Sequence, residues 1–229
     1  MDKQSVSHRL LSIYHQLMAH YGLQYWWPAK EPFEVIVGAI LTQSAAWSNV
    51  EKAIASLKSA GALSPKALRR LPLSQVAALI YPCGYYNAKA VKLKSFARWL
   101  GECYEDDLNK LFSDDTAHLR QQLLSIHGIG QETADSIILY AANKPIFVID
   151  AYTRRIINRF GLAPDSDSYA AYQALFMNNL PTEVRLFNEY HALLVCLAKK
   201  LCRSRPLCRQ CCLNNMCHFH IVDDTHRLN

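Results

Sequence analysis

Hydrophobic residues recur at the spacing of an α-helix along nearly the whole chain. Between His8 and Ala19 they occupy one helical face, formed by Leu10, Leu11, Tyr14, Leu17 and Met18. No segment of useful length alternates between polar and apolar positions as a half-buried strand would, and neither internal repeats nor low-complexity stretches occur. We therefore expect an all-α fold.

Proline, glycine and capping residues divide this pattern into separate helices. Pro32 suits the first position of a helix, and Ser48 with Glu51 has the spacing of a capping box that opens the next one. Gly61 is a typical stop signal. Further along, the pattern predicts helices from residue 86 onward and over 118–126, 136–142, 152–160, 169–179 and 182–200, with an extended stretch at 146–149.

Two glycines bracket one isoleucine between two of the predicted helices, at Gly128-Ile129-Gly130. Glycine leaves successive backbone N–H groups unobstructed and able to converge on one point. The next helix adds the dipole and the orphan N–H groups of its N-terminus, which suits a phosphate. The pattern favours a helix–hairpin–helix that grips one DNA strand independently of its sequence. A plain corner between two helices is the alternative.

The composition limits the class of protein. Of the 229 residues, 51% are hydrophobic, which is enough for a buried core. The charged fraction of 19% is too low for a disordered tail protein. The N-terminus lacks the apolar segment of a secretion signal, and the longest apolar runs fall far short of a membrane span. We expect a cytoplasmic protein, and the net charge of +6 weakly favours a polyanionic partner.

Five of the eight cysteines lie between Cys202 and Cys217. In a reducing compartment such a cluster indicates a metal site rather than disulfides. Cys83, Cys103 and Cys196 fall in helical or turn segments and are expected to be small core residues.

Asp150 stands after the extended segment Pro145–Ile149 and before the next helix. The succession of hairpin, apolar helix, proline-containing loop and aspartate resembles the helix–hairpin–helix base-excision DNA glycosylases, most closely their endonuclease III-like branch. The resemblance covers roughly Pro32 to Cys217. Residues 41–43 and 84–90 are similar to the loops with which that branch faces DNA.

This resemblance implies a two-lobed architecture. One lobe would comprise residues 30–144 and end in the hairpin, and the other would join residues 1–29 to 145–229. It also implies a monomer that acts on double-stranded DNA holding a damaged base and that is associated with the nucleoid when it does so.

A carboxylate has a clear use in such an enzyme. Hydrolysis of an N-glycosidic bond develops positive charge on the sugar, and a carboxylate beside C1′ stabilises that charge and orients or deprotonates the attacking water. The resemblance gives this role to Asp150. The common alternative is that Asp150 only caps the helix beginning at Ala151. Both roles can hold, because the helix dipole also keeps a capping carboxylate ionised.

Bifunctional members of the family carry a lysine two residues after the second hairpin glycine, and its amine attacks the sugar and permits strand cleavage. Glu132 occupies that position here, and a carboxylate cannot form an imine. We place Glu132 in the substrate pocket and expect a monofunctional glycosylase that leaves an abasic site. Lys144 or another amine is an alternative source of weak lyase activity.

A glycosylase takes its target base out of the stack. By resemblance, Gln43 and Tyr85 lie on the two loops that enter the duplex; the alternatives are a buried amide and a core aromatic. Trp26, Trp27 and Trp47 are similar to the aromatic residues that sandwich the flipped base in the 3-methyladenine glycosylase members. An N-alkylated purine is cationic, so facing aromatic rings favour it. Ordinary packing by tryptophan is the alternative.

The spacing Cys202-x5-Cys208-x2-Cys211-x5-Cys217 resembles the [4Fe–4S] loop of the same family, with one residue fewer in the first interval. Cys212 is an alternative to Cys211 as the third ligand. A zinc site and a loop without metal are the other interpretations.

Arginines are threaded through the cysteine loop. Arg203 and Arg205 offer phosphates a cationic face that would fix position and salt dependence, or they belong to a solvated charged loop.

We thus expect a monofunctional glycosylase for alkylated purines such as 3-methyladenine. The same scaffold acting on uracil, thymine or adenine in mispairs is one alternative. A damaged-DNA-binding protein without catalysis is another.

Overall fold

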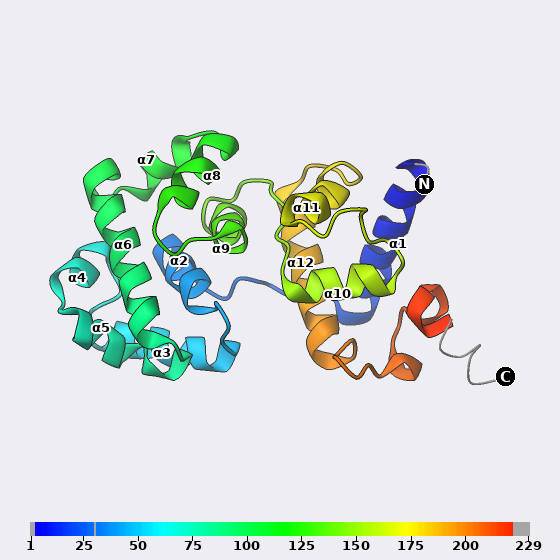
Figure 1. The fold of residues 1–229 in the computed structure, drawn as a ribbon, viewed down its shortest axis with the longest axis horizontal. Coiled ribbons are helices and arrows are strands. Elements are labelled where there is room, and N and C mark those ends of the chain that lie inside the picture. Colours follow the sequence, from blue (N-terminus) through cyan, green and yellow to red (C-terminus); the bar gives the residue numbers. More distant parts are fainter. Residues whose placement is uncertain (1–2, 30, 222–229) are drawn as a thin grey trace. The chain divides into compact units, whose positions relative to one another are not determined.

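The computed structural model describes residues 3–29 and 31–221, and every regular element in these ranges is helical (Figure 1). The prediction of an all-α fold is confirmed. The chain divides into two compact units. The central unit is residues 27–144, and the terminal unit joins residues 1–26 to residues 145–229. Within the described ranges no helix is both long enough and apolar enough to cross a membrane.

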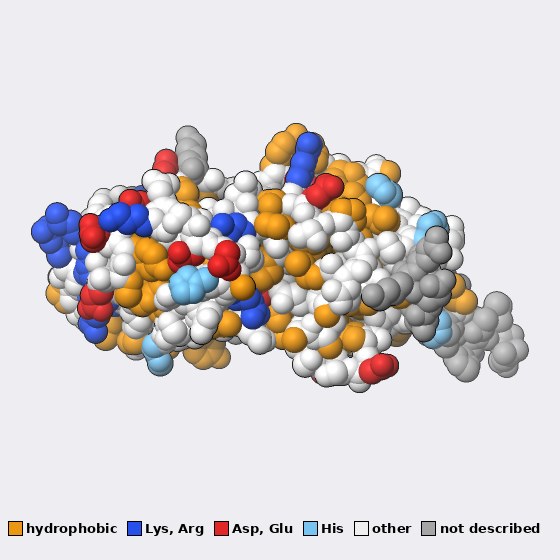
Figure 2. Space-filling model, turned by 90° about the horizontal axis from the view of Figure 1, so that it is seen from above, with side chains coloured by type: hydrophobic (Ala, Val, Ile, Leu, Met, Phe, Trp, Pro, Cys, Tyr) orange, Lys and Arg blue, Asp and Glu red, His pale blue; other side chains and the backbone are white. Residues whose placement is uncertain are grey.

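The central unit is organised around one buried helix and one long helix. It comprises α2 (Pro32–Leu41), α3 (Trp47–Ser59), α4 (Pro65–Arg70), α5 (Leu73–Leu79), the 3₁₀ turn η1 (Tyr81–Cys83), α6 (Tyr86–Tyr104), α7 (Leu108–Ser113), α8 (Thr116–Ser125), α9 (Gln131–Ser136) and the π-helical turn η2 (Ile137–Ala141). The long helix α6 packs against α4 and α5, and α2 packs against η2. Because nearly every residue of α2 is buried, its apolar sequence fixes it at the centre of this unit. On the face drawn in Figure 2, this unit (left) carries basic and acidic side chains interspersed rather than gathered by sign.

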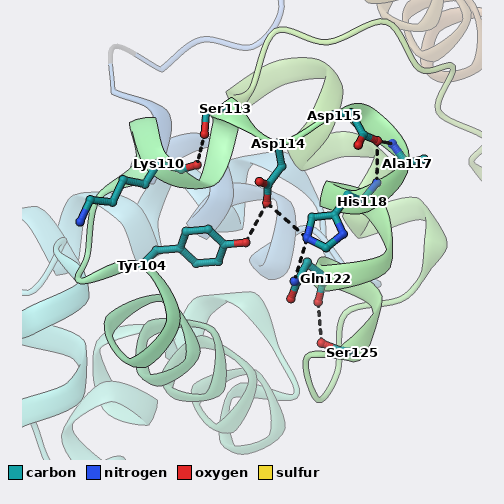
Figure 3. Close-up of polar contacts among 9 residues, drawn as sticks. All are labelled: Tyr104, Lys110, Ser113, Asp114, Asp115, Ala117, His118, Gln122 and Ser125. Carbon is teal, nitrogen blue, oxygen red and sulfur yellow. Dashed lines mark hydrogen bonds and ion pairs between the residues drawn. The ribbon is translucent and has the colours of Figure 1, made fainter.

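Side-chain capping fixes the helix that leads into the glycine turn. Asp115 Oδ1 accepts hydrogen bonds from the amides of Ala117 and His118, both at 2.9 Å, and so caps the N-terminus of α8 (Figure 3). Next to it, the Tyr104 hydroxyl at the end of α6 donates to Asp114 Oδ2 at 2.8 Å. Burial and this bond raise the pKa of Tyr104 to about 12, so Tyr104 stays a donor at neutral pH.

The terminal unit consists of α1 (Lys3–Tyr21), α10 (Ala151–Arg159), α11 (Tyr169–Met177), α12 (Val184–Lys200) and two short 3₁₀ turns, η3 (Cys208–Gln210) and η4 (Asn214–Met216). The helix α12 packs against both α1 and α10. Phe147 in the extended segment stacks on Phe176, with centroids 3.8 Å apart and planes 8° apart, and meets Phe187 edge to face. This aromatic core anchors the segment that ends at Asp150.

Candidate active site

Asp150 is the N-cap of α10. Its backbone is extended and its Oδ1 accepts the Thr153 amide hydrogen at 2.7 Å. The residues before it are also held, because Gln173 Nε2 donates to the Phe147 carbonyl at 2.8 Å and the Ile149 amide donates to the Tyr169 hydroxyl at 3.2 Å. The carboxylate therefore has a fixed position with one oxygen used by the cap.

The second carboxylate oxygen of Asp150 faces a histidine. His191 Nε2, on the buried side of α12, lies 3.7 Å from Asp150 Oδ2, and the two side chains are 8% and 14% exposed. Burial raises the pKa of the Asp150 carboxyl, but His191 and the Thr153 amide outweigh burial, so the pKa lies below its usual range. At neutral pH the group is a carboxylate, as the stabilisation of a cationic sugar requires.

The glycine turn differs at its two glycines. Gly128 adopts φ +84°, a conformation that favours glycine, whereas Gly130 is extended with φ −92° and ψ 179° and forms the N-cap of α9. The Ile129 side chain is only 5% exposed, and its amide donates to the Ile126 carbonyl at 3.1 Å. The Ile129 side chain is therefore buried and its amide is occupied, whereas Gly130 is unobstructed, since a Cβ there would meet nothing within 4 Å among the described residues.

A partly buried ion pair holds the two helices of this turn together. Arg120 on α8 donates to Asp135 on α9 through Nε at 2.7 Å and Nη2 at 3.2 Å, and Asp135 is fully buried. The bidentate geometry fixes the angle between α8 and α9.

Alanine substitutions at the two glycines should differ in their effect on the free energy of unfolding. A Cβ on Gly128 would lie 2.3 Å from Lys92 Cγ in a left-handed backbone, so Gly128→Ala should lower the free energy of unfolding by about 2–4 kcal/mol. At Gly130 such a Cβ meets nothing within 4 Å in the described part of the chain. Gly130→Ala should therefore change the free energy of unfolding by less than about 0.5 kcal/mol. Urea unfolding of both variants measures this difference. Equal losses would contradict the hairpin geometry.

Gln43 is half-buried and bound to this hairpin. Its Nε2 donates to the Gly128 carbonyl at 3.1 Å and to Thr133 Oγ1 at 2.9 Å, and its Oε1 accepts a hydrogen bond from Lys92 Nζ. The side chain predicted to enter the duplex is thus held on the hairpin in the free protein.

Tyr85 is 75% exposed and has φ +46°, an uncommon backbone for a bulky residue. Gly84 before it also has a positive φ, and α6 begins directly after it. The chain holds an aromatic ring outward at a conformational cost, which is typical of functional positions.

Two of the three predicted pocket tryptophans, Trp27 and Trp47, are in direct contact. Trp27 belongs to the central unit and Trp26 to the terminal unit. Trp27 meets Trp47 edge to face, with centroids 5.1 Å apart and planes 87° apart, and it also contacts Tyr140 at 5.4 Å. Gly38 on α2 makes room for the Trp27 ring, because a Cβ there would lie 2.8 Å from it. Trp27 and Trp47 therefore contact each other directly, and Tyr140 joins the same aromatic group.

Tyr140 reaches Trp27 from an unusual turn. The amide of Ala142 donates to the Ile137 carbonyl at 3.0 Å, five residues back, which makes η2 a π-turn. Glu132 lies on the exposed side of the first turn of α9, upstream on the same helical segment.

Four cysteines line one cavity in the terminal unit. These are Cys202, Cys208, Cys211 and Cys217, and the cavity wall is otherwise largely apolar. Burial raises the pKa of the Cys211 thiol to about 11. In the described residues, no group of three or more His, Cys, Asp or Glu side chains is close enough to hold a single metal ion.

Arg159 at the end of α10 ties this loop down. Its Nη1 donates to Cys202 Sγ at 3.1 Å and to the Arg203 carbonyl at 2.7 Å, and its Nη2 donates to the Ser204 carbonyl at 3.1 Å. The same helix therefore carries Asp150 at one end and holds the cysteine loop at the other. The predicted phosphate contacts Arg203 and Arg205 are both exposed.

A model of the helix–hairpin–helix (HhH-GPD) superfamily of base excision DNA repair proteins matches residues 37–182, a span that contains both the hairpin and Asp150. The chain belongs to this superfamily. It is a DNA N-glycosylase of the endonuclease III-like branch.

Two relatives align with most of this glycosylase chain. A provisionally named DNA repair glycosylase of Methanocaldococcus jannaschii is 41% identical over 216 residues, which are 94% of this chain and 98% of that protein. Endonuclease III of Sulfolobus acidocaldarius is 29% identical over 194 residues, or 84% of each chain.

Solved structures show the same fold. The 3-methyladenine DNA glycosylase of H. pylori, bound to 1,N6-ethenoadenine, matches with a TM-score of 0.70 and 25% identity over 87% of this chain and 98% of that one. An endonuclease III–DNA complex matches with a TM-score of 0.82 and 18% identity over 96% and 98%.

Several residues that hold the predicted site residues of this glycosylase carry little signal in the local sequence. His191 and Arg159 contact Asp150 and Cys202 from distant segments, and nothing in their local sequence distinguishes them from other helical residues. Lys89, whose Nζ donates to the Leu41 and Cys83 carbonyls, did carry a signal, because it lies one helical turn before Leu93 on the buried face of α6.

Proposed function

We propose that this glycosylase hydrolyses the N-glycosidic bond of an alkylated purine such as 3-methyladenine in double-stranded DNA, and that it leaves an abasic site without cutting the strand. The observation that carries the proposal is Asp150, a fixed carboxylate whose pKa is held below its usual range by His191 and the Thr153 amide. A group of this kind is what a departing base requires on the sugar side.

The chemistry follows from the charge that develops. As the bond to the base lengthens, the sugar becomes an oxocarbenium-like cation, and the Asp150 carboxylate stabilises it. The same carboxylate orients or deprotonates the water that adds to C1′. Since Oδ1 accepts the Thr153 amide hydrogen, these tasks fall to Oδ2, which also faces His191.

The preference for an alkylated purine is supported by the Trp27, Trp47 and Tyr140 group. A cationic base gains from an aromatic face by cation–π attraction, whereas neutral uracil or thymine gains less. An alkylated purine is also a good leaving group, so one carboxylate suffices. The H. pylori neighbour is a 3-methyladenine glycosylase, which supports the same substrate class.

The absence of strand cutting rests on Glu132, which occupies the place of the lyase lysine. With duplexes that each hold one lesion, the protein should release base most rapidly from the alkylated purine, and the DNA strand should stay intact. Borohydride should trap no covalent complex. The Glu132→Lys variant provides the positive control, because it supplies an amine two residues after Gly130. Efficient trapping of the unchanged protein, through Lys144 or another amine, would contradict the proposal.

The cysteine loop fits an iron–sulfur cluster. Four thiols line one cavity whose wall is otherwise largely apolar, which suits a buried cofactor. We propose that Cys202, Cys208, Cys211 and Cys217 hold a [4Fe–4S] cluster; Cys211 rather than Cys212 lines the cavity. When bound, the cluster supplies four iron–thiolate bonds that close the loop. Arg159 Nη1 donates to Cys202 Sγ and so holds this proposed ligand in position.

The remaining predicted residues concern contact with DNA. We propose that Gly130 and the N-terminus of α9 bind one phosphate, that Arg203 and Arg205 bind others, and that Gln43 and Tyr85 enter the duplex. We further propose that the enzyme acts as a monomer.

A further inference from the structure

Helix α6 places a lysine ammonium inside the central unit. Lys89 is 2% exposed, and its Nζ donates to the Leu41 carbonyl at 2.9 Å and to the Cys83 carbonyl at 2.8 Å. Burying a charged group carries a large desolvation penalty unless it is well hydrogen-bonded. Burial accordingly lowers the pKa of Lys89. The buried Lys89 ammonium is thus accommodated through its hydrogen bonds to the Leu41 and Cys83 carbonyls.

The two carbonyls that Lys89 binds end two separate elements. Leu41 is the last residue of α2, and Gln43 follows two residues later. Cys83 is the last residue of η1, and Tyr85 follows two residues later. One ammonium group thus caps the C-terminal ends of both elements from which the loops of Gln43 and Tyr85 leave.

A second lysine of α6 reaches the side chain on one of these loops. Lys92 Nζ donates to Gln43 Oε1, and the methylene stem of Lys92 lies against Gly128. Lys89 and Lys92 therefore fix the backbone of the Gln43 loop and the direction of its side chain from the same helix.

We propose that Lys89 is a positioning residue for base extrusion. It holds the loops of Gln43 and Tyr85 at the mutual spacing at which both enter the duplex. The inference rests on the proposed function, because it requires that these loops open the duplex. It assigns to Lys89 no contact with DNA, substrate or the reacting atoms.

Lys94 offers a matched control on the same helix. Its Nζ donates to the carbonyls of Leu68, Arg69 and Leu71, at 2.9, 3.0 and 2.5 Å, and so caps α4. No predicted DNA contact lies on α4. Lys89→Met and Lys94→Met each remove an ammonium that caps a helix, and only the first touches the proposed duplex-opening loops.

The readout is base unstacking, which is independent of chemistry. A 2-aminopurine beside the lesion brightens when its neighbour leaves the stack, and it is measured together with the single-turnover rate of base release. Lys89→Met should lose most of the fluorescence rise and about 100-fold in release rate, since a displacement of about 1 Å at a reacting group costs that much. Lys94→Met should keep both within about threefold at a similar thermal unfolding midpoint.

Two results would overturn the inference. One is a Lys89→Met variant that unstacks the base as well as Lys94→Met does. If Lys89→Met does not fold, Lys89→Gln, which keeps amide donors, is measured in its place. The second overturning result is then a Lys89→Gln variant that unstacks the base normally but releases it slowly. If the unchanged protein unstacks the base but releases none, the proposed function fails while Lys89 is still judged by the fluorescence.

Discussion

Replacement of Asp150 by Asn should lower the single-turnover rate of base release by about 10²-fold or more and leave the affinity for duplex DNA nearly unchanged. Asparagine is as good an N-cap as aspartate, so α10 keeps its capping residue. What disappears is the negative charge that stabilises the cationic sugar. Rapid-quench kinetics on a duplex with one alkylated purine measure the rate, and a filter or fluorescence titration measures the affinity.

A second capping aspartate supplies the control for Asp150. Asp115 caps α8 through two backbone amides in the same way, and the proposed chemistry gives it no role. Asp115→Asn should therefore release base at the normal rate. An Asp150→Asn variant as active as Asp115→Asn would reduce Asp150 to a helix cap and remove the catalytic account.

Loss of a cluster ligand should have the second large effect. The purified protein should be yellow-brown and contain iron and sulfide, and Cys202→Ser should lose the colour. Because loss of a structural metal site costs more than about 4 kcal/mol, the unfolding midpoint should fall by roughly 8–16 °C in a chain of this size. Absorbance, iron analysis and a thermal melt measure these changes on the same sample.

Cys212 is the matched control for the cluster prediction. It neighbours Cys211 in the chain but does not line the cavity formed by the other described residues of the loop. Cys212→Ser should keep both the colour and the midpoint. A colourless, iron-free protein whose midpoint is indifferent to Cys202→Ser would contradict the cluster.

Local sequence signals predicted the parts of the site that depend on a few neighbouring residues. The hairpin is one, since Gly128 does take a positive φ and Gly130 does open a helix. Asp150 is another, because an aspartate between an extended segment and a helix becomes an N-cap from local geometry alone.

The contacts that complete the site depend on tertiary packing, which no local pattern encodes. The partner of Asp150 is His191, which comes from a helix that lies far along the chain. Ile129 is a second residue whose surroundings the local sequence does not predict. It lies between the two glycines of the turn, yet its side chain is only 5% exposed. The edge-to-face contact of Trp27 with Trp47 likewise could not be inferred from the residue types.

The most direct test of the central claim is the release of free base from DNA treated with a methylating agent, analysed by chromatography for the unchanged protein and for Asp150→Asn. The account predicts that the unchanged protein liberates 3-methyladenine and leaves one abasic site in an unbroken strand for each base, and that Asp150→Asn liberates almost none. Release of no base by the unchanged protein, or equal release by both, would contradict it.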